Sequence, residues 1–144
     1  MRKIMLILVA AFLINGLTGC SYVFYPRASE FAEKAKGATS VETLLNLTAM
    51  MEASAKESKG GQGVDQPLDD LHNQFHAFDD SLCSVDKAKR ETPAYALVKT
   101  HNKELWAIFK RLWKFKDMQP QRDDHLNVFM AEVRELRGTL EELK

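Results

Sequence analysis

The chain has 144 residues, of which 45% are hydrophobic and 28% are charged, and its 20 basic residues balance its 20 acidic ones. This length is sufficient for one domain with a hydrophobic core. The balanced charge excludes the strongly basic surface that is typical of nucleic-acid-binding proteins, so nucleic acid is not an expected partner.

The first twenty residues have the layout of a secretory signal. Arg2 and Lys3 precede a short apolar run, and the segment closes on the sequence LTGC at residues 17–20. The apolar run is too short for a comfortable membrane span. Residues 17–20 resemble the lipobox of bacterial lipoprotein precursors. This resemblance implies cleavage before Cys20 and lipid attachment to the Cys20 thiol, with a plain signal peptide or a short signal anchor as the alternatives.

Cleavage at this point would divide the chain into three parts. Residues 1–19 are the expected signal peptide, residues 20–38 a lipidated tether, and residues 39–144 the folded domain. The mature chain would have 144 − 19 = 125 residues and a side-chain charge of 18 − 20 = −2. Ser21 in place of aspartate favours the outer membrane, by analogy with enterobacterial sorting. We therefore expect a protein anchored by its N-terminal lipid at the periplasmic face of that membrane.

The tether is unusually aromatic. Tyr22, Phe24 and Tyr25 would lie beside the bilayer, where Tyr favours the interface, or fold back onto the domain. Residues 28–36 follow with the spacing of a short helix, which Gly37 ends.

Four longer amphipathic helices are expected after the tether. The first begins at a capping box of Thr39 and Glu42 and reaches about residue 58. Glycines at 60, 61 and 63 interrupt the pattern. The second helix carries Pro67 in its first turn and is capped by Asp65 or Gln66.

The remaining two helices also have recognisable starts. The third begins at Thr92-Pro93 and reaches about residue 116. The sequence Gln119-Pro120 is expected to end that segment, and Asp123 or Asp124 to cap the last helix.

Apolar residues recur in each helix at steps of three and four positions. The expected buried seams are Val41, Leu44, Leu45, Thr48, Met51 and Ala55; Leu68, Leu71, Phe75, Phe78 and Leu82; Ala94, Val98, His101, Leu105, Ile108, Leu112 and Phe115; and Leu126, Phe129, Val133, Leu136, Leu140 and Leu143. Four such helices with short connections predict an all-α fold, an antiparallel (up-down-up-down) four-helix bundle.

The sequence contains no catalytic signature. A glycine-rich phosphate loop, G-x-S-x-G, H-E-x-x-H and C-x-x-C are all missing. An enzyme is therefore not expected.

A polar stripe on the second helix is the first candidate metal site. It consists of His72, His76, Asp79 and Cys83, whose spacings of four, three and four residues place them on one helical face. Two histidines at i and i+4 can bind Zn²⁺ or Cu²⁺. The ordinary interpretation is a solvated polar border, and a haem ligand or a pH-sensitive contact is the further alternative.

Cys83 has its own significance if Cys20 is lipidated, because it is then the single free thiol of the mature chain. We expect it to be buried, since a free cysteine packs as a small hydrophobe. An intermolecular disulfide or a role as a metal ligand is the alternative.

His101 occupies a seam position among apolar residues. It is expected either to bond a neighbouring helix within the core or to be an axial haem ligand opposite Met50 or Met51. The architecture of b-type cytochromes is similar only in outline, and no further cofactor is expected.

The segment from residue 106 to 116 (WAIFKRLWKFK) mixes aromatic and basic residues. It forms part of the core or an exposed patch that binds a partner or lipid, with Trp106, Lys110 and Trp113 as the contact residues. The expected function is that of a non-enzymatic lipoprotein binding another component of the cell envelope. The alternative is a haem- or metal-binding helical bundle.

Overall fold

A computed structural model of the protein describes residues 25–144. The predicted signal peptide, Cys20, Tyr22 and Phe24 lie outside the described residues. The described part of the chain is helical and contains no strand, which confirms the all-α class. None of its helices is both long enough and apolar enough to cross a membrane.

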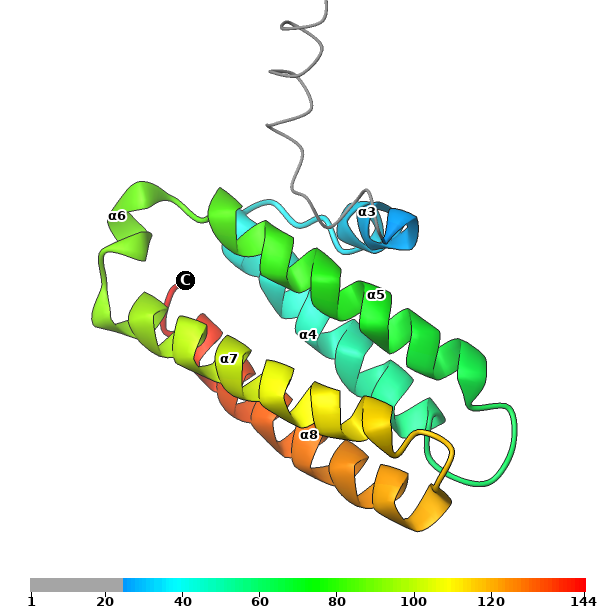
Figure 1. The fold of residues 1–144 in the computed structure, drawn as a ribbon. Helices are drawn as coiled ribbons and strands as arrows, with labels where there is room; N and C mark the ends of the chain where they lie inside the picture. The colour runs from blue at the N-terminus through cyan, green and yellow to red at the C-terminus, as the bar shows by residue number, and fades with distance from the viewer. Residues whose placement is uncertain (1–24) are drawn as a thin grey trace, which may run out of the picture.

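Figure 1 shows the helices in chain order. They are α3 (Pro26–Lys34), α4 (Ser40–Glu57), α5 (Asp65–Ser81), the short 3-10 turn η1 (Leu82–Ser84), α6 (Lys87–Arg90), α7 (Pro93–Lys114) and α8 (Gln119–Glu141).

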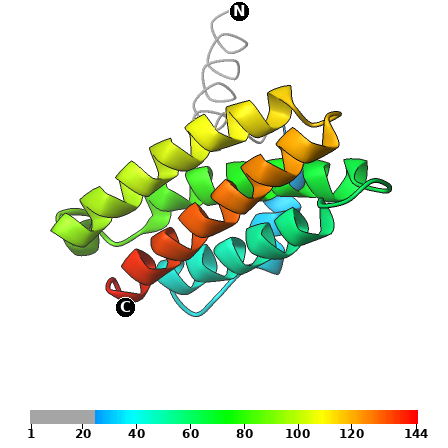
Figure 2. The same ribbon diagram turned by 90° about the horizontal axis from the view of Figure 1, so that it is seen from below.

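The four long helices lie side by side, and α3 lies against α5 (Figures 1 and 2). Helix α7 packs along α8, α4 packs along α5, and α4 also contacts α8. The backbones of α5 and α7 approach each other less closely than these pairs do. Aromatic side chains bridge that wider gap, with the ring centroids of Phe75 and Trp106 4.6 Å apart. The α5–α7 interface is therefore built on large side chains.

The core contains the seam that the second helix was expected to bury. Its five residues, Leu68 to Leu82, are each at most 7% exposed. Phe75, Phe78 and Phe129 are the largest of the fully buried side chains. Truncating a side chain of this kind to alanine costs about 3 to 5 kcal/mol, so the seams carry much of the stability.

Two of the predicted helix starts are confirmed. Thr39 Oγ1 accepts a hydrogen bond of 3.1 Å from the Glu42 backbone N–H, and the Glu42 carboxylate accepts one from the Thr39 N–H. Thr92 Oγ1 likewise accepts from the Tyr95 N–H at the start of α7. Both caps satisfy N–H groups that have no partner within the helix.

The side-chain caps predicted for the other two helices are wrong, whereas Pro67 lies in the first turn of α5 as expected. Helix α5 begins at Asp65 with Val64 as its N-cap, and α8 begins at Gln119 with Pro120 in its first turn. Neither helix has a side-chain cap, and Asp123 and Asp124 lie within α8 because that helix begins at Gln119. The N–H groups of the first helical turn have no carbonyl partner within the helix. Proline, which lacks an N–H, can therefore lie in that turn.

Candidate functional site: an aromatic groove between α5 and α7

The two histidines of the polar stripe face each other on α5. The Nε2 atoms of His72 and His76 are 3.2 Å apart, one helical turn from one another. His76 is only 6% exposed, and the ring of Tyr25 stacks on it with the centroids 3.6 Å apart. The interpretation of this pair as a solvated polar border is therefore wrong, because the rings pack among aromatic side chains.

Helix α7 supplies the opposite wall with Trp106, Phe109 and Trp113. The ring centroid of His72 lies 5.0 Å from that of Phe109 and 4.9 Å from that of Trp113. Trp106 is partly buried against Phe75, whereas Trp113 is 38% exposed. The aromatic segment is thus neither pure core nor a free patch, since its rings line a surface hollow.

That first hollow has a volume of about 290 Å³. It is lined by Tyr25, His72, Trp106, Phe109, Lys110 and Trp113. The histidine stripe and the aromatic-basic segment, expected as separate sites, therefore meet at one place.

A second hollow of about 470 Å³ shares Trp106 with the first. It is lined by Asp79, Asp80, Leu82, Cys83, Tyr95, Lys99, Asn102, Lys103 and Trp106. We refer to these two hollows together as the α5–α7 groove, since Trp106 lines both.

The stripe does not converge on a single metal ion. Asp79 Oδ1 accepts a hydrogen bond of 2.6 Å from the Asn102 side chain, in the second hollow. Cys83 is exposed, so the expectation that it is buried is wrong. Helix α5 ends at Ser81 and Cys83 lies in η1, so the helical spacing that placed it on the stripe no longer applies there.

The environment of the two histidines favours their neutral forms. Burial, with a smaller contribution from the neighbouring His76, lowers the pKa of His72 to about 4, although the Asp69 carboxylate acts in the opposite direction. Burial also lowers the pKa of His76, against the opposing effect of Asp79. Both rings are therefore neutral near pH 7, which is the form that binds metals and accepts hydrogen bonds.

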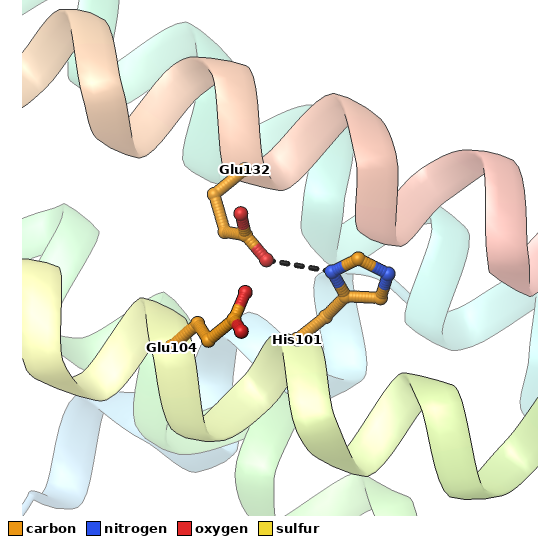
Figure 3. Close-up of side chains that lie close together, drawn as sticks. All are labelled: His101, Glu104 and Glu132. Atoms are coloured by element: carbon orange, nitrogen blue, oxygen red, sulfur yellow. Dashed lines mark hydrogen bonds and ion pairs between the residues drawn. The ribbon is translucent and has the colours of Figure 1, made fainter.

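His101 lies outside the groove, between α7 and α8. Its Nδ1 atom is 2.6 Å from Glu132 Oε1, and Glu104 projects toward the same point (Figure 3). One potential ligand atom from each of the three residues lies within 4.8 Å of the others, so they could hold a metal ion. Sequence reasoning missed Glu104 and Glu132 as partners. The three-residue spacing of His101 and Glu104 was the only available signal, because Glu132 comes from another helix.

The haem hypothesis stays a prediction. His101 is paired with Glu132 through Nδ1, which leaves Nε2 as the nitrogen that could bind iron. Met51 is fully buried in the core and Met50 is partly buried against it. Thioether side chains pack well in cores, so packing alone accounts for the burial of both methionines.

Fold and groove together define an all-helical protein with a surface groove lined by histidine and tryptophan. No protein-family model matches the chain, and no curated protein and no solved structure is significantly similar to it.

Proposed function

We propose that the chain is a non-enzymatic lipoprotein, anchored through Cys20 at the periplasmic face of the outer membrane, that binds another envelope component. Its long helices form an up-down-up-down four-helix bundle in this proposal. The α5–α7 groove is the observation that carries it, because it exposes aromatic surface in a concave setting. Binding sites are typically hollows with mostly apolar walls and a few polar groups.

The bundle is supported by the packing of the long helices. Consecutive long helices α4 and α5, and α7 and α8, are neighbours, and α4 also contacts α8. Short connections between neighbouring helices favour antiparallel packing.

The anchor is supported by the LTGC sequence at residues 17–20. Cys20 precedes Tyr25 by five residues, which span at most about 17 Å in extended chain. Tyr25 lines the groove, so a lipid on Cys20 would hold the groove close to the bilayer. A component of the same membrane would then meet the groove at high effective concentration.

Palmitate labelling tests the anchor. Wild-type protein should incorporate labelled palmitate and lose its signal peptide, and Cys20→Ala should do neither. Labelled Cys20→Ala protein would contradict the anchor, whatever the groove binds.

Capture from solubilised envelopes tests the groove. Trp113→Ala should reduce recovery of a bound component, because aromatic side chains dominate the energy of most interfaces. Leu97→Ala is the matched control, since Leu97 is an exposed apolar residue of α7 that lines neither hollow. Equal loss in both variants would argue against the groove.

Metal binding is a second candidate function, favoured by the group of His101, Glu104 and Glu132. One nitrogen and two carboxylate ligands suit Zn²⁺, which binds nitrogen and oxygen at about 2.0 to 2.2 Å. The His72–His76 pair offers a further two nitrogens for Zn²⁺ or Cu²⁺.

A further inference from the structure

We propose that the α5–α7 groove binds an amphipathic helix of a partner protein, with an acidic flank of that helix lying along α7. This inference rests on the proposed function, for which it names the kind of envelope component.

The length of the groove suits a helix. Its lining residues on α7 run from Tyr95 to Trp113, with Trp106 common to both hollows. At 1.5 Å per residue this stretch is about 27 Å long. A partner helix of about 18 residues would fill it, and such a helix presents apolar side chains at steps of three and four positions.

Apolar side chains line the groove at both ends and in the middle. Trp113 and Phe109 lie at one end, Trp106 in the middle, and Tyr95 and Leu82 at the other end. Trp106 and Trp113 are only partly covered by the chain itself. Tryptophan is enriched among the residues that contribute most to binding at protein interfaces, so covering these rings with apolar side chains would favour binding.

The α7 rim carries uncompensated positive charge. Lys99, Lys103 and Lys110 are exposed, and none of them forms an ion pair with an acidic side chain within residues 25–144. Lys99 lies over the ring of Tyr95, so it is held at the rim. Acidic side chains of a partner could therefore pair with these three lysines, which are spaced four and seven residues apart on α7.

The α5 rim carries the opposite charge. Asp79 lines the second hollow. At the other end Asp69 and Asp70 are paired with Arg27, at 2.7 and 2.6 Å, so their charge is already compensated. A helix with one acidic and one basic flank matches these two rims.

A flat anionic bilayer matches them less well. The groove is concave, and the carboxylate of Asp79 would face the lipid phosphates across it. Like charges brought together at an interface are unfavourable. A protein helix is therefore the occupant that shape and charge favour, and lipid is an outcome that the test must separate.

Two synthetic 18-residue peptides would serve as probes. Both have leucine on one face, but the first has one Glu flank and one Lys flank, whereas the second has Lys on both flanks. Binding of each labelled peptide to the full chain in detergent would be measured by fluorescence anisotropy. We expect the first peptide to bind about tenfold more tightly than the second.

Charge reversal supplies the decisive comparison. In Lys103→Glu/Lys110→Glu two of the three lysines of the α7 rim become glutamates, so the preference should invert in favour of the second peptide. Lys36→Glu/Arg111→Glu is the matched control, since it changes the net charge equally with exposed residues that line neither hollow. There the original preference should persist.

Each other outcome contradicts the inference. Binding of neither peptide, or an unchanged preference in Lys103→Glu/Lys110→Glu, would exclude an amphipathic helix. Attachment to vesicles of phosphatidylethanolamine and phosphatidylglycerol that this variant abolishes, with no peptide binding, would identify lipid as the occupant. If Trp113-dependent capture of an envelope component survives either result, the proposed function stands and only the helical partner is excluded.

Discussion

His72 and His76 hold their Nε2 atoms 3.2 Å apart on α5, and the ring of Tyr25 stacks on His76. One ring nitrogen must donate and the other accept, so this contact requires that the two rings are not both protonated. Tyr25, at the start of the described chain, is therefore packed against the groove through neutral imidazole rings.

Acidification should destabilise the protein through this pair. The pKa of His72 is lowered to about 4 in the folded state, from about 6.5 when unfolded. Between these values the unfolded chain binds more protons than the folded one, so stability is complete above pH 6.5 and falls as the pH decreases. From about pH 7.5 to about pH 5 we expect a loss of about 1 to 2 kcal/mol, allowing for the partial exposure of His72. Urea unfolding at both pH values would measure it.

His72→Gln should reduce that difference, because glutamine does not titrate. His125→Gln is the control, since it removes a histidine that stacks on Phe115 of the α7–α8 connection, away from the groove. A pH dependence that is the same in wild type and His72→Gln would show that the His72–His76 pair is not its source.

The two tryptophans of the groove should differ in their effect on stability. Trp106 packs edge-on against the buried Phe75, so Trp106→Ala should cost about 2 to 4 kcal/mol of unfolding free energy. Trp113 is 38% exposed, so Trp113→Ala should cost less than about 1 kcal/mol. Thermal or urea unfolding of the two variants measures both values. Equal losses would mean that Trp113 is core rather than a binding residue.

Zinc should bind at His101, Glu104 and Glu132 if the second candidate function is correct. Calorimetry on the metal-free chain should show one equivalent of Zn²⁺, and a hundredfold excess over Kd should raise the unfolding free energy by about 2.7 kcal/mol. Glu132→Gln should abolish both effects. Glu135→Gln, on the exposed face of α8, is the control. His72→Gln tests whether the His72–His76 pair binds zinc instead. Undiminished binding in Glu132→Gln would exclude this site.

The sequence predicted most helices and buried faces because both are local properties. The face of α7 is an exception: four residues of its expected seam are only partly buried, whereas Tyr95, Asn102 and Phe109 beside it are buried. The partly buried four are Ala94, His101, Ile108 and Phe115. The three-four spacing from Leu68 to Leu82 reports directly which face is buried, and the capping box of Thr39 and Glu42 is complete within four residues. The caps of α5 and α8 were predicted wrongly because neither helix has the polar side-chain cap that the sequence signal assumes.

The groove could be predicted only in its parts. Periodicity identifies the face of each helix but not the helix that lies opposite. His72 and Trp113 are 113 − 72 = 41 residues apart in the chain, and their contact depends on how α5 and α7 pack. The contact between His101 and Glu132 likewise depends on how α7 and α8 pack. Each candidate residue was recognisable from its chemistry, whereas its partner required the tertiary structure.

Arg122 should be essential for stability although it lies in no predicted site. It is 4% exposed and donates through Nη1 to the Lys116 carbonyl, 2.9 Å away, and through Nη2 to the Gly60 carbonyl. It therefore joins the α4–α5 connection, where Gly60 has a φ of +102° that favours glycine, to the α7–α8 connection. Arg122→Met should cost about 2 to 4 kcal/mol, because it leaves these carbonyls without a charged donor.

Arg122→Lys should recover little of that loss, since one ammonium group cannot reproduce the two-pronged geometry of guanidinium. Arg134→Met is the matched control: Arg134 bonds to Glu52 at the exposed surface, so its loss should cost less than about 1 kcal/mol. Urea unfolding of the three variants distinguishes the cases. If Arg122→Lys were as stable as the wild type, the buried charge alone, and not the bridging of two connections, would account for the role of Arg122.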